Sequence, residues 1–143
     1  MPSIFHWEHT VLDAEIDGQG HANNVVYVEW LQSAAVAHST AQGWPGARYQ
    51  ELGFGWVARR HTIEYLQPAF AGESIVVRTW VATMKRVSSL RKYQILRNDD
   101  HGLLAKAETL WAFIDYDARQ PRRILPEVVA SFDLVSEPPA LPG

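Results

Sequence analysis

An apolar run that begins at Asn23 or Asn24 and ends at Gln42 dominates the hydrophobic pattern of the chain. Either asparagine can cap a helix, because its side-chain oxygen accepts hydrogen bonds from the free N–H groups of the first turn. Gly43 and then Pro45 supply the usual stop signals. Glu29, Gln32, Ser33 and Ser39 form only a narrow polar stripe within the run. A helix that is apolar on almost every side is normally buried, so we predict a long helix enclosed by the rest of the chain.

Strand-like segments flank this helix. Residues 3–12 alternate between apolar and polar side chains, which is typical of a half-buried strand. Four segments rich in Val, Ile, Trp, Tyr and Thr follow the helix: Trp56–Leu66, Glu73–Arg86, Ser88–Arg97 and Leu103–Tyr116. Short turns join them, so neighbouring strands are expected to pair antiparallel. Residues 119–143 contain five prolines and are predicted to form a tail or a docked extension.

The order of one strand, one buried helix and four long strands predicts an α+β fold. In this fold an antiparallel five-stranded sheet curls around one long central helix. We expect residues 1–143 to form a single domain. A curled sheet keeps edge strands and an outer face, which favours association with other copies. Trp80 and Trp111 would either serve such an interface or complete the core.

Composition narrows the function classes. The chain is 47% hydrophobic and 20% charged, as soluble globular domains are, and it has no cysteine for a disulfide or a thiolate site. A formal net charge of −3 argues against general nucleic-acid binding. The central helix is too interrupted by polar residues to span a bilayer. No signal-peptide pattern opens the sequence, so a cytoplasmic location is expected.

Several segments resemble known binding motifs but lack a feature that each motif requires. The segment from Asp13 to Gly18 resembles the start of a calcium loop, yet its twelfth position is Asn24 and not a bidentate glutamate. The G-x-G-x-x-A match at Gly53 precedes a strand-like run and offers no helix N-terminus for a pyrophosphate. The six histidines show no ligand spacing. No metal site is therefore predicted.

Asp17, just before the central helix, is the best candidate for chemistry. Unpaired N–H groups at a helix N-terminus can polarise a carbonyl and stabilise an oxyanion. A nearby carboxylate can attack the same carbon, or act as base for a water molecule. The alternative is that Asp17 only caps the helix or binds loop amides. The residues by themselves leave both interpretations open.

The segment from Asp17 to Tyr27 resembles the D-x-x-G-H-x-N-N-x-x-Y signature of hotdog-fold acyl-CoA thioesterases, in particular the 4-hydroxybenzoyl-CoA thioesterase-like group. The run from Val57 to Ala69, followed by Gly72-Glu73, is similar to that family's long strand and its Y-x-x-P-A-x-x-G-D turn. The likeness covers roughly residues 4–132.

The resemblance implies a role for each matching residue. Asp17 falls on the family's catalytic aspartate, as nucleophile or general base. Asn24 lies where a backbone N–H polarises the thioester carbonyl. His21 and Asn23 shape the loop, with His21 also a candidate for substrate contact, and Tyr27 packs or lines the acyl pocket. Glu15-Ile-Asp17 replaces the family's frequent Asp-Thr-Asp. Leu31, Val57 and Ile63 are further candidates for the acyl pocket.

The anionic nucleotide of coenzyme A requires basic residues at the surface. Lys85 and Arg86, at a predicted strand end, are the favoured pair. The other candidates are Arg59, Arg60, His61, Ser88, Arg91, Arg122 and Arg123. The alternative is that these residues simply keep strand faces in water. In the family such sites form between subunits, which implies a homodimer and, from two dimers, a homotetramer.

The predicted function is hydrolysis of an acyl-CoA thioester without metal or redox cofactor. Three alternatives remain open at this point. The substrate can be carried by an acyl-carrier protein in place of CoA. The fold also hosts hydratases and dehydratases, which resemble an Asp-x₄-His dyad, whereas Asp17 and His21 have three residues between them. A non-catalytic acyl-binding protein is the third. The sequence does not name the acyl group.

Overall fold

The computed structural model describes residues 3–142, so residues 1, 2 and 143 of the predicted domain lie outside the described part. The apolar run forms helix α1 (Asn24–Ala41), and Asn23 is its N-cap. The strands are β1 (Phe5–Thr10), β2 (Phe54–Tyr65), β3 (Ser74–Met84), β4 (Ser88–Arg97), β5 (Leu103–Asp115) and the two-residue β6 (Gln120–Pro121). Short helices complete the chain: the 3₁₀ turn η1 (Asp13–Glu15), α2 (Gly46–Leu52) and α3 (Pro126–Ala130).

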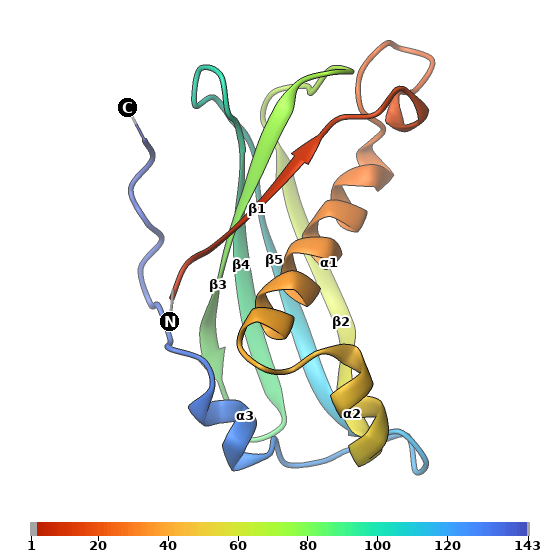
Figure 1. The fold of residues 1–143 in the computed structure, drawn as a ribbon, viewed down its shortest axis with the longest axis vertical. Coiled ribbons are helices and arrows are strands. Elements are labelled where there is room, and N and C mark those ends of the chain that lie inside the picture. Colours follow the sequence, from red (N-terminus) through yellow and green to blue (C-terminus); the bar gives the residue numbers. More distant parts are fainter. Residues whose placement is uncertain (1–2, 143) are drawn as a thin grey trace.

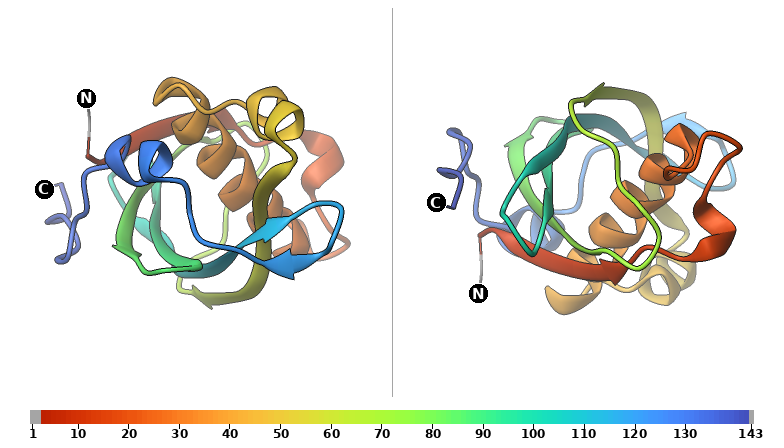
Figure 2. Two further views of the ribbon diagram at one scale, coloured as in Figure 1. Left: turned by 90° about the horizontal axis from the view of Figure 1, so that it is seen from below. Right: turned by 90° about the horizontal axis from the view of Figure 1, so that it is seen from above.

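The strands form one antiparallel sheet in the order β1-β3-β4-β5-β2, and β6 pairs with β5. The five long strands are those predicted, with ends that differ by one or two residues at most positions. The sheet curls around α1, as the views along its axis show (Figure 2). β1 and β2 are the two edges, and β2 is the longer, with 12 residues.

Alternation along the strands decides which side chains meet the helix. Ile75, Val77 and Ile95 of the central strands pack with Leu31 and Ala34 of α1 in the main core. A second cluster at the C-terminal end of α1 contains Trp44, Tyr49, Val81, Phe113, Ile124, Val128 and Phe132. Trp80 is buried and Trp111 packs against the main core. Within one chain, Trp111 therefore completes the packed interior, whereas Trp80 is buried on the outer face of β3.

One prediction about α1 is wrong. The helix is buried on the side that faces the sheet, but Val25 and Val36 on its other side are 65% and 60% exposed. The sheet is open, with two free edges, and so it covers only part of the helix circumference (Figure 1). An apolar composition on every side thus marks a helix with a second, uncovered apolar side.

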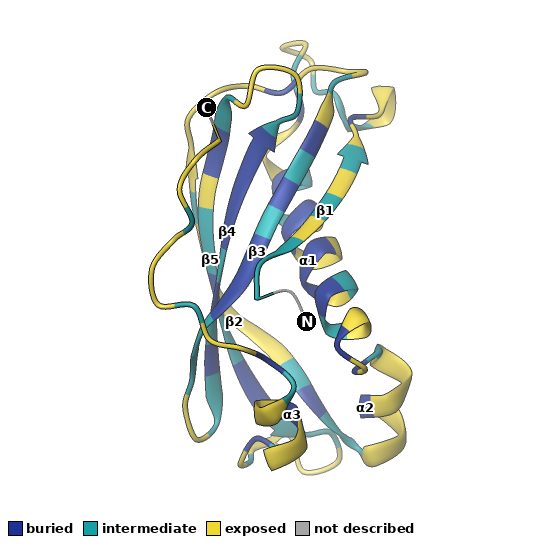
Figure 3. Ribbon diagram, turned by 60° about the vertical axis from the view of Figure 1, so that its left-hand side comes forward, coloured by how far each residue is buried: buried dark blue, intermediate teal, exposed yellow. Residues whose placement is uncertain are grey.

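The C-terminal segment is a docked extension. After α3, Val135 N–H donates to Val81 O at 2.9 Å and continues the edge of β3 beyond the end of β1. Farther along, the Arg78 side chain donates to Ala140 O and Gln94 donates to Pro139 O. The tail therefore runs along the outer face of the sheet over β3 and β4 (Figures 1 and 3). Among residues 3–142, no helix is long and apolar enough to cross a membrane.

Candidate active site

The loop before α1 folds back on itself as a very small hairpin. Asp17 N–H donates to His21 O at 3.0 Å, and Asn23 N–H donates to Glu15 O at 2.9 Å. Ile16 and Ala22 form an isolated antiparallel bridge between these bonds. Gly20, at the turn, has a φ of +89°, a conformation that glycine adopts without steric cost. This arrangement sets His21 opposite Asp17 and leads the chain directly into the helix.

The carboxylate of Glu15 anchors this hairpin to the rest of the molecule. Its Oε1 lies 2.9 Å from His9 Nε2 on β1 and accepts from Leu12 N–H at 2.8 Å. Its Oε2 accepts from Trp30 Nε1 on α1 at 3.0 Å. Burial acts to raise the pKa of Glu15, but these hydrogen bonds outweigh burial and hold the pKa below its ordinary value. Glu15 therefore ties β1, the loop and α1 together as an anion.

The first turn of α1 keeps one free donor. The Asn23 side chain accepts from Val25 N–H at 3.0 Å, and Asn23 O accepts from Val26 N–H. The N–H of Asn24 has no acceptor in the described chain, although its carbonyl accepts from Tyr65 OH at 2.8 Å. A backbone N–H is thus available for a ligand at the positive end of an 18-residue helix.

Asp17 uses one of its two carboxylate oxygens within the loop. Oδ1 accepts from Gln19 N–H at 2.8 Å, so the predicted alternative, binding of a loop amide, is partly realised. Oδ2 accepts no hydrogen bond from residues 3–142. The carboxyl group is half-buried, and the loop holds it in place. The geometry therefore leaves one oxygen for chemistry and does not by itself decide between the two interpretations.

The neighbouring motif residues contribute in different ways. His21 is half-buried, and its ring packs against that of Phe70 in a T-shaped arrangement, with a centroid distance of 6.3 Å. Tyr27 is only 2% exposed and packs against Trp30 and Tyr65, with ring centroids 4.8 and 5.0 Å away. Burial raises the pKa of the Tyr27 hydroxyl. Tyr27 is therefore a core residue in the single chain, one of the two roles predicted for it.

The basic candidates lie far from this loop in the same chain. Lys85 and Arg86 are exposed in the turn between β3 and β4, where Lys85 N–H donates to the carbonyl of Ser88 at 2.8 Å. The first residue of β3 pairs with the last residue of β1, next to the Asp17 loop, so the turn lies about 35 Å away along the sheet. Arg59 is exposed in the middle of β2, beside a bulge. The structure does not bring these residues to Asp17 within one chain.

Other candidates also differ from expectation. Arg91 is 6% exposed and lies on the inner side of the curled sheet, so the prediction that it lies at the surface is wrong. Its position on β4 has the same parity as the inward-facing Tyr93 and Ile95. His61 Nδ1 lies 2.8 Å from Thr109 Oγ1, and burial lowers the His61 pKa. Arg60 and Arg123 are exposed and Arg122 is half-buried against the ring of Phe54.

Sequence reasoning missed two groups of functional interest. The contacts of Glu15 with His9 and Trp30 join residues from separate elements, and no local sequence pattern predicts them. The buried guanidinium of Arg91 lies in a cavity at the C-terminal end of α1, which contains no residue of the Asp17 loop. The alternation along β4 was the signal for its inward direction.

Known proteins are similar to this chain over nearly its whole length. The chain is 26% identical over 135 residues to the acyl-CoA thioester hydrolase YbgC of Escherichia coli O6:H1, covering 91% of this chain and 96% of that protein. A 1,4-dihydroxy-2-naphthoyl-CoA thioesterase from Synechocystis superposes with a TM-score of 0.85 at 18% identity, covering 94% of this chain and 99% of that chain. A Staphylococcus aureus protein solved in complex with CoA gives a TM-score of 0.85 at 13% identity, covering 94% and 89%.

The solved structures confirm the predicted hotdog fold, with its curled antiparallel sheet and long helix. The sequence profile of the thioesterase-like superfamily matches residues 11–132, which include the Asp17 loop, α1 and all the long strands after it. The match extends over most of the chain, and the protein belongs to the thioesterase-like superfamily.

Proposed function

We propose that this protein hydrolyses an acyl-CoA thioester to a carboxylic acid and free CoA at the Asp17 loop. The observation that carries the proposal is that one loop holds a carboxylate oxygen and a helix N–H, neither of which has a partner in the described chain. Membership of the thioesterase-like superfamily and the likeness to an acyl-CoA thioester hydrolase support the choice of substrate.

The proposed reaction begins when the thioester carbonyl accepts a hydrogen bond from Asn24 N–H. The helix N-terminus then stabilises the negative charge that develops on this oxygen, an effect worth about 3 kcal/mol per donor. Asp17 acts in one of two ways. As a general base it takes a proton from a water molecule that attacks the carbon. As a nucleophile it attacks directly and forms an anhydride that water then cleaves. In both cases the C–S bond breaks and CoA leaves as a thiolate that becomes protonated.

The first experiment compares Asp17→Asn and Asp17→Ala with the wild type in an assay for free CoA. Both substitutions are expected to lower kcat by at least about a hundredfold, because each removes the carboxylate that serves as base or nucleophile in the proposed reaction. Asp13→Asn, an exposed loop carboxylate, is the matched control and should retain full activity. Turnover close to wild type in both Asp17 variants would remove Asp17 from the reaction.

A single turnover in oxygen-18 water separates the two roles. If Asp17 is the general base, the heavy oxygen enters the product acid in the first turnover. If Asp17 is the nucleophile and water cleaves the anhydride at the carboxyl carbon of Asp17, the product takes an ordinary oxygen from the carboxylate, and the heavy oxygen is found in Asp17. Mass spectrometry of the acid and of the peptide that contains residue 17 reads both outcomes.

We also propose that the complete site forms between two copies of the chain. β2 is a long edge strand with an exposed middle, and such an edge can pair with its own copy about a two-fold axis (Figure 3). Antiparallel pairing of two β2 strands places the Asp17 end of one chain beside the Lys85 end of the other. Arg59 would lie near the axis, and Lys85, Arg86 and Ser88 would then reach the nucleotide of a substrate held by the partner's loop.

A further inference from the structure

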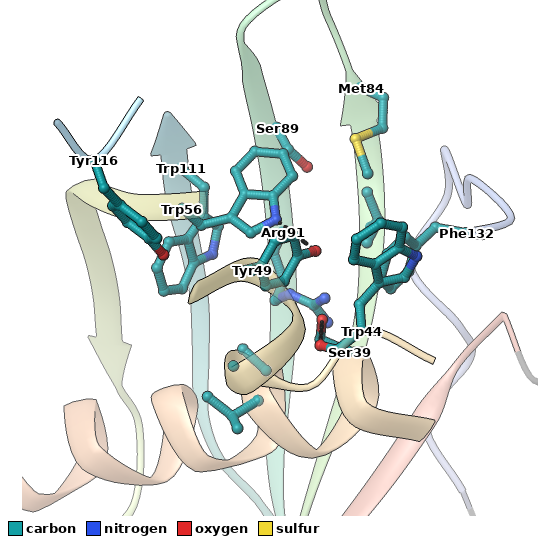
Figure 4. Close-up of a pocket in the computed structure, with 14 residues that line it drawn as sticks. Ser39, Trp44, Tyr49, Trp56, Met84, Ser89, Arg91, Trp111, Tyr116 and Phe132 are labelled. Atoms are coloured by element: carbon teal, nitrogen blue, oxygen red, sulfur yellow. Dashed lines mark hydrogen bonds between the residues drawn. The ribbon is translucent and has the colours of Figure 1, made fainter. Parts of the chain in front are cut away.

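A cavity of about 200 Å³ opens at the end of α1 that is farthest from Asp17. It lies between the C-terminal half of α1, the short helix α2 and the nearby ends of β2, β3 and β4 (Figure 4). Six of the residues that line it are aromatic: Trp44, Tyr49, Trp56, Trp111, Tyr116 and Phe132. An apolar cavity of about 150 Å³ is enough to hold a benzene ring. The space therefore fits a ring-sized organic group.

Arg91 gives this aromatic cavity a buried positive charge. Its Nη1 donates to Thr79 Oγ1 at 3.1 Å and contacts His38 Nδ1 at 2.9 Å. The N–H groups on Nε and Nη2 have no hydrogen-bond acceptor within residues 3–142. No Asp or Glu lines the cavity, and no described carboxylate forms an ion pair with Arg91.

A buried charge without a counter-ion in this position destabilises the folded protein. Taking an ion out of water without a counter-ion costs several kcal/mol, and a guanidinium cannot escape this cost by losing its proton. Burial does lower the pKa of Arg91, as expected for a cation held away from water. An apolar residue of similar length would pack among the aromatic rings at lower cost. The charge is therefore best explained by an anion that enters the cavity.

We propose that this cavity is a binding site for a ring-sized organic carboxylate, with Arg91 pairing with the carboxylate and the aromatic walls holding the ring. A guanidinium matches a carboxylate with two parallel N–H···O bonds, which a planar acid can accept while its ring stacks on tryptophan or tyrosine. Two sources share this chemistry. The carboxylate can be the distal end of a dicarboxylic acyl group whose thioester lies at an Asp17 loop, or it can be a separate small acid.

Isothermal titration with benzoate tests the site directly, and benzyl alcohol serves as the neutral probe of equal size. The wild type is expected to bind benzoate at least tenfold more tightly than benzyl alcohol. Arg91→Met should lose this preference, since replacing a buried ion by an apolar residue is commonly neutral or stabilising for the fold. Lys92→Met, the next residue on the same strand, faces the other side of the sheet and should bind as the wild type does.

A second pair of variants blocks the space and leaves the charge in place. Val36→Trp puts a large ring at an exposed position that lines the cavity, and should abolish benzoate binding. Val25→Trp puts the same ring at an exposed position on the same helix outside the cavity, and should not. Equal benzoate affinity in wild type and Arg91→Met, or no binding to the wild type at millimolar concentrations, overturns the proposal.

The same variants distinguish the two sources of the carboxylate, the distal end of an acyl group and a separate small acid. If the cavity holds the end of an acyl group, hydrolysis of a dicarboxylic monothioester should fall at least tenfold in kcat/KM in Arg91→Met, with hexanoyl-CoA unchanged. If the ligand is a separate acid, benzoate binding is lost but both substrates react as before. Benzoate titration of Asp17→Asn is independent of turnover. It therefore tests the cavity even if no thioester is hydrolysed and the proposed function fails.

Discussion

At the scale of single residues, the Asp17 loop depends on one half-buried anion, the carboxylate of Glu15. Glu15 receives hydrogen bonds from β1, from the loop backbone and from α1, and so it couples three segments that share no continuous secondary structure. Its geometry explains why a loop rich in glycine can hold Asp17 in one place. The carboxylate need not touch a substrate to affect the reaction.

Glu15→Gln tests this coupling through the pH dependence of stability. Folding lowers the pKa of Glu15 below its ordinary value of 4.5, so its contribution to stability is complete above that value and is lost as the pH falls through the lower folded pKa. At pH 7 the variant is expected to be less stable by about 1–3 kcal/mol, and the difference should shrink below pH 4. Thermal unfolding from pH 3 to 7 measures it, with Asp13→Asn as a control that shows no such trend.

Asn24 offers a sharper test of the helix N-terminus, because the proposed group is its backbone N–H. Proline is favoured at the first position of a helix and lacks this N–H, and the extended conformation of Asn23 is compatible with a following proline. Asn24→Pro is therefore expected to fold and to lose a factor of about 100 to 1,000 in kcat.

The control for this experiment is Asn24→Ala, which removes the side chain and keeps the N–H. It should retain activity within about threefold. Equal loss in both variants, measured by release of CoA, would mean that the side chain acts and the backbone donor does not.

The sequence predicted this site only in part, and the reason is the range of the interactions. Asn23 as a cap, Asp17 beside it and Gly20 at the turn follow from local rules on helix ends and turns. The contacts of Glu15 with His9 and Trp30 join side chains 6 and 15 positions away, on different elements. Only the assembled fold brings them together, so no periodic pattern could show them.

At the scale of elements, periodicity was informative for long segments and uninformative for short ones. α1 and the five long strands are long enough for their hydrophobic pattern to predict whether each is a helix or a strand. α2 has seven residues and α3 has five, and each lies among glycines or prolines that predict loops. The apolar composition of α1 predicts complete burial, whereas the open sheet leaves Val25 and Val36 exposed to water.

A close contact between β2 and the end of β5 leads to a further prediction. Gly55 lies directly against the ring of Tyr116, and a Cβ at this position would collide with that ring. Gly55→Ala is therefore expected to cost about 1–3 kcal/mol through overpacking. Gly46→Ala, where nothing lies within 4 Å, should be neutral or slightly stabilising.

The collision can be isolated by a double-mutant cycle with Tyr116→Ala. If the tyrosine ring causes the loss, Gly55→Ala should cost much less in the Tyr116→Ala background. Denaturant unfolding of the four proteins gives the coupling free energy. A coupling near zero would place the strain elsewhere on β2.

At the scale of the whole molecule, the two groups of candidate residues lie at opposite ends of one curled sheet. Asp17 is at one end, and Lys85 and Arg86 are at the other. A site that uses both requires two chains in opposite directions, for which the exposed edge of β2 is suited. Charge and pattern in a single sequence cannot reveal such a pairing, because they do not say which chain supplies each residue.

Mixing two inactive variants tests this arrangement. Asp17→Asn keeps the basic turn, and the double variant Lys85→Gln/Arg86→Gln keeps the loop. After exchange in equal amounts, about half of the dimers are mixed and each contains one complete site, so activity should recover to about a quarter of the wild type. Light scattering checks that dimers form. No recovery on mixing, with exchange confirmed, would confine the site to one chain.

The docked tail has a consequence of a different kind. Alternation turns Trp80 to the outer face of β3, where residues 135–140 run past it and its exposure is only 1%. Its indole is thus an internal fluorescent reporter of tail position. Any event that detaches the tail, whether a change of salt or a second pair of chains competing for that face, should shift its emission to longer wavelengths, and Trp80→Phe identifies its share of the signal.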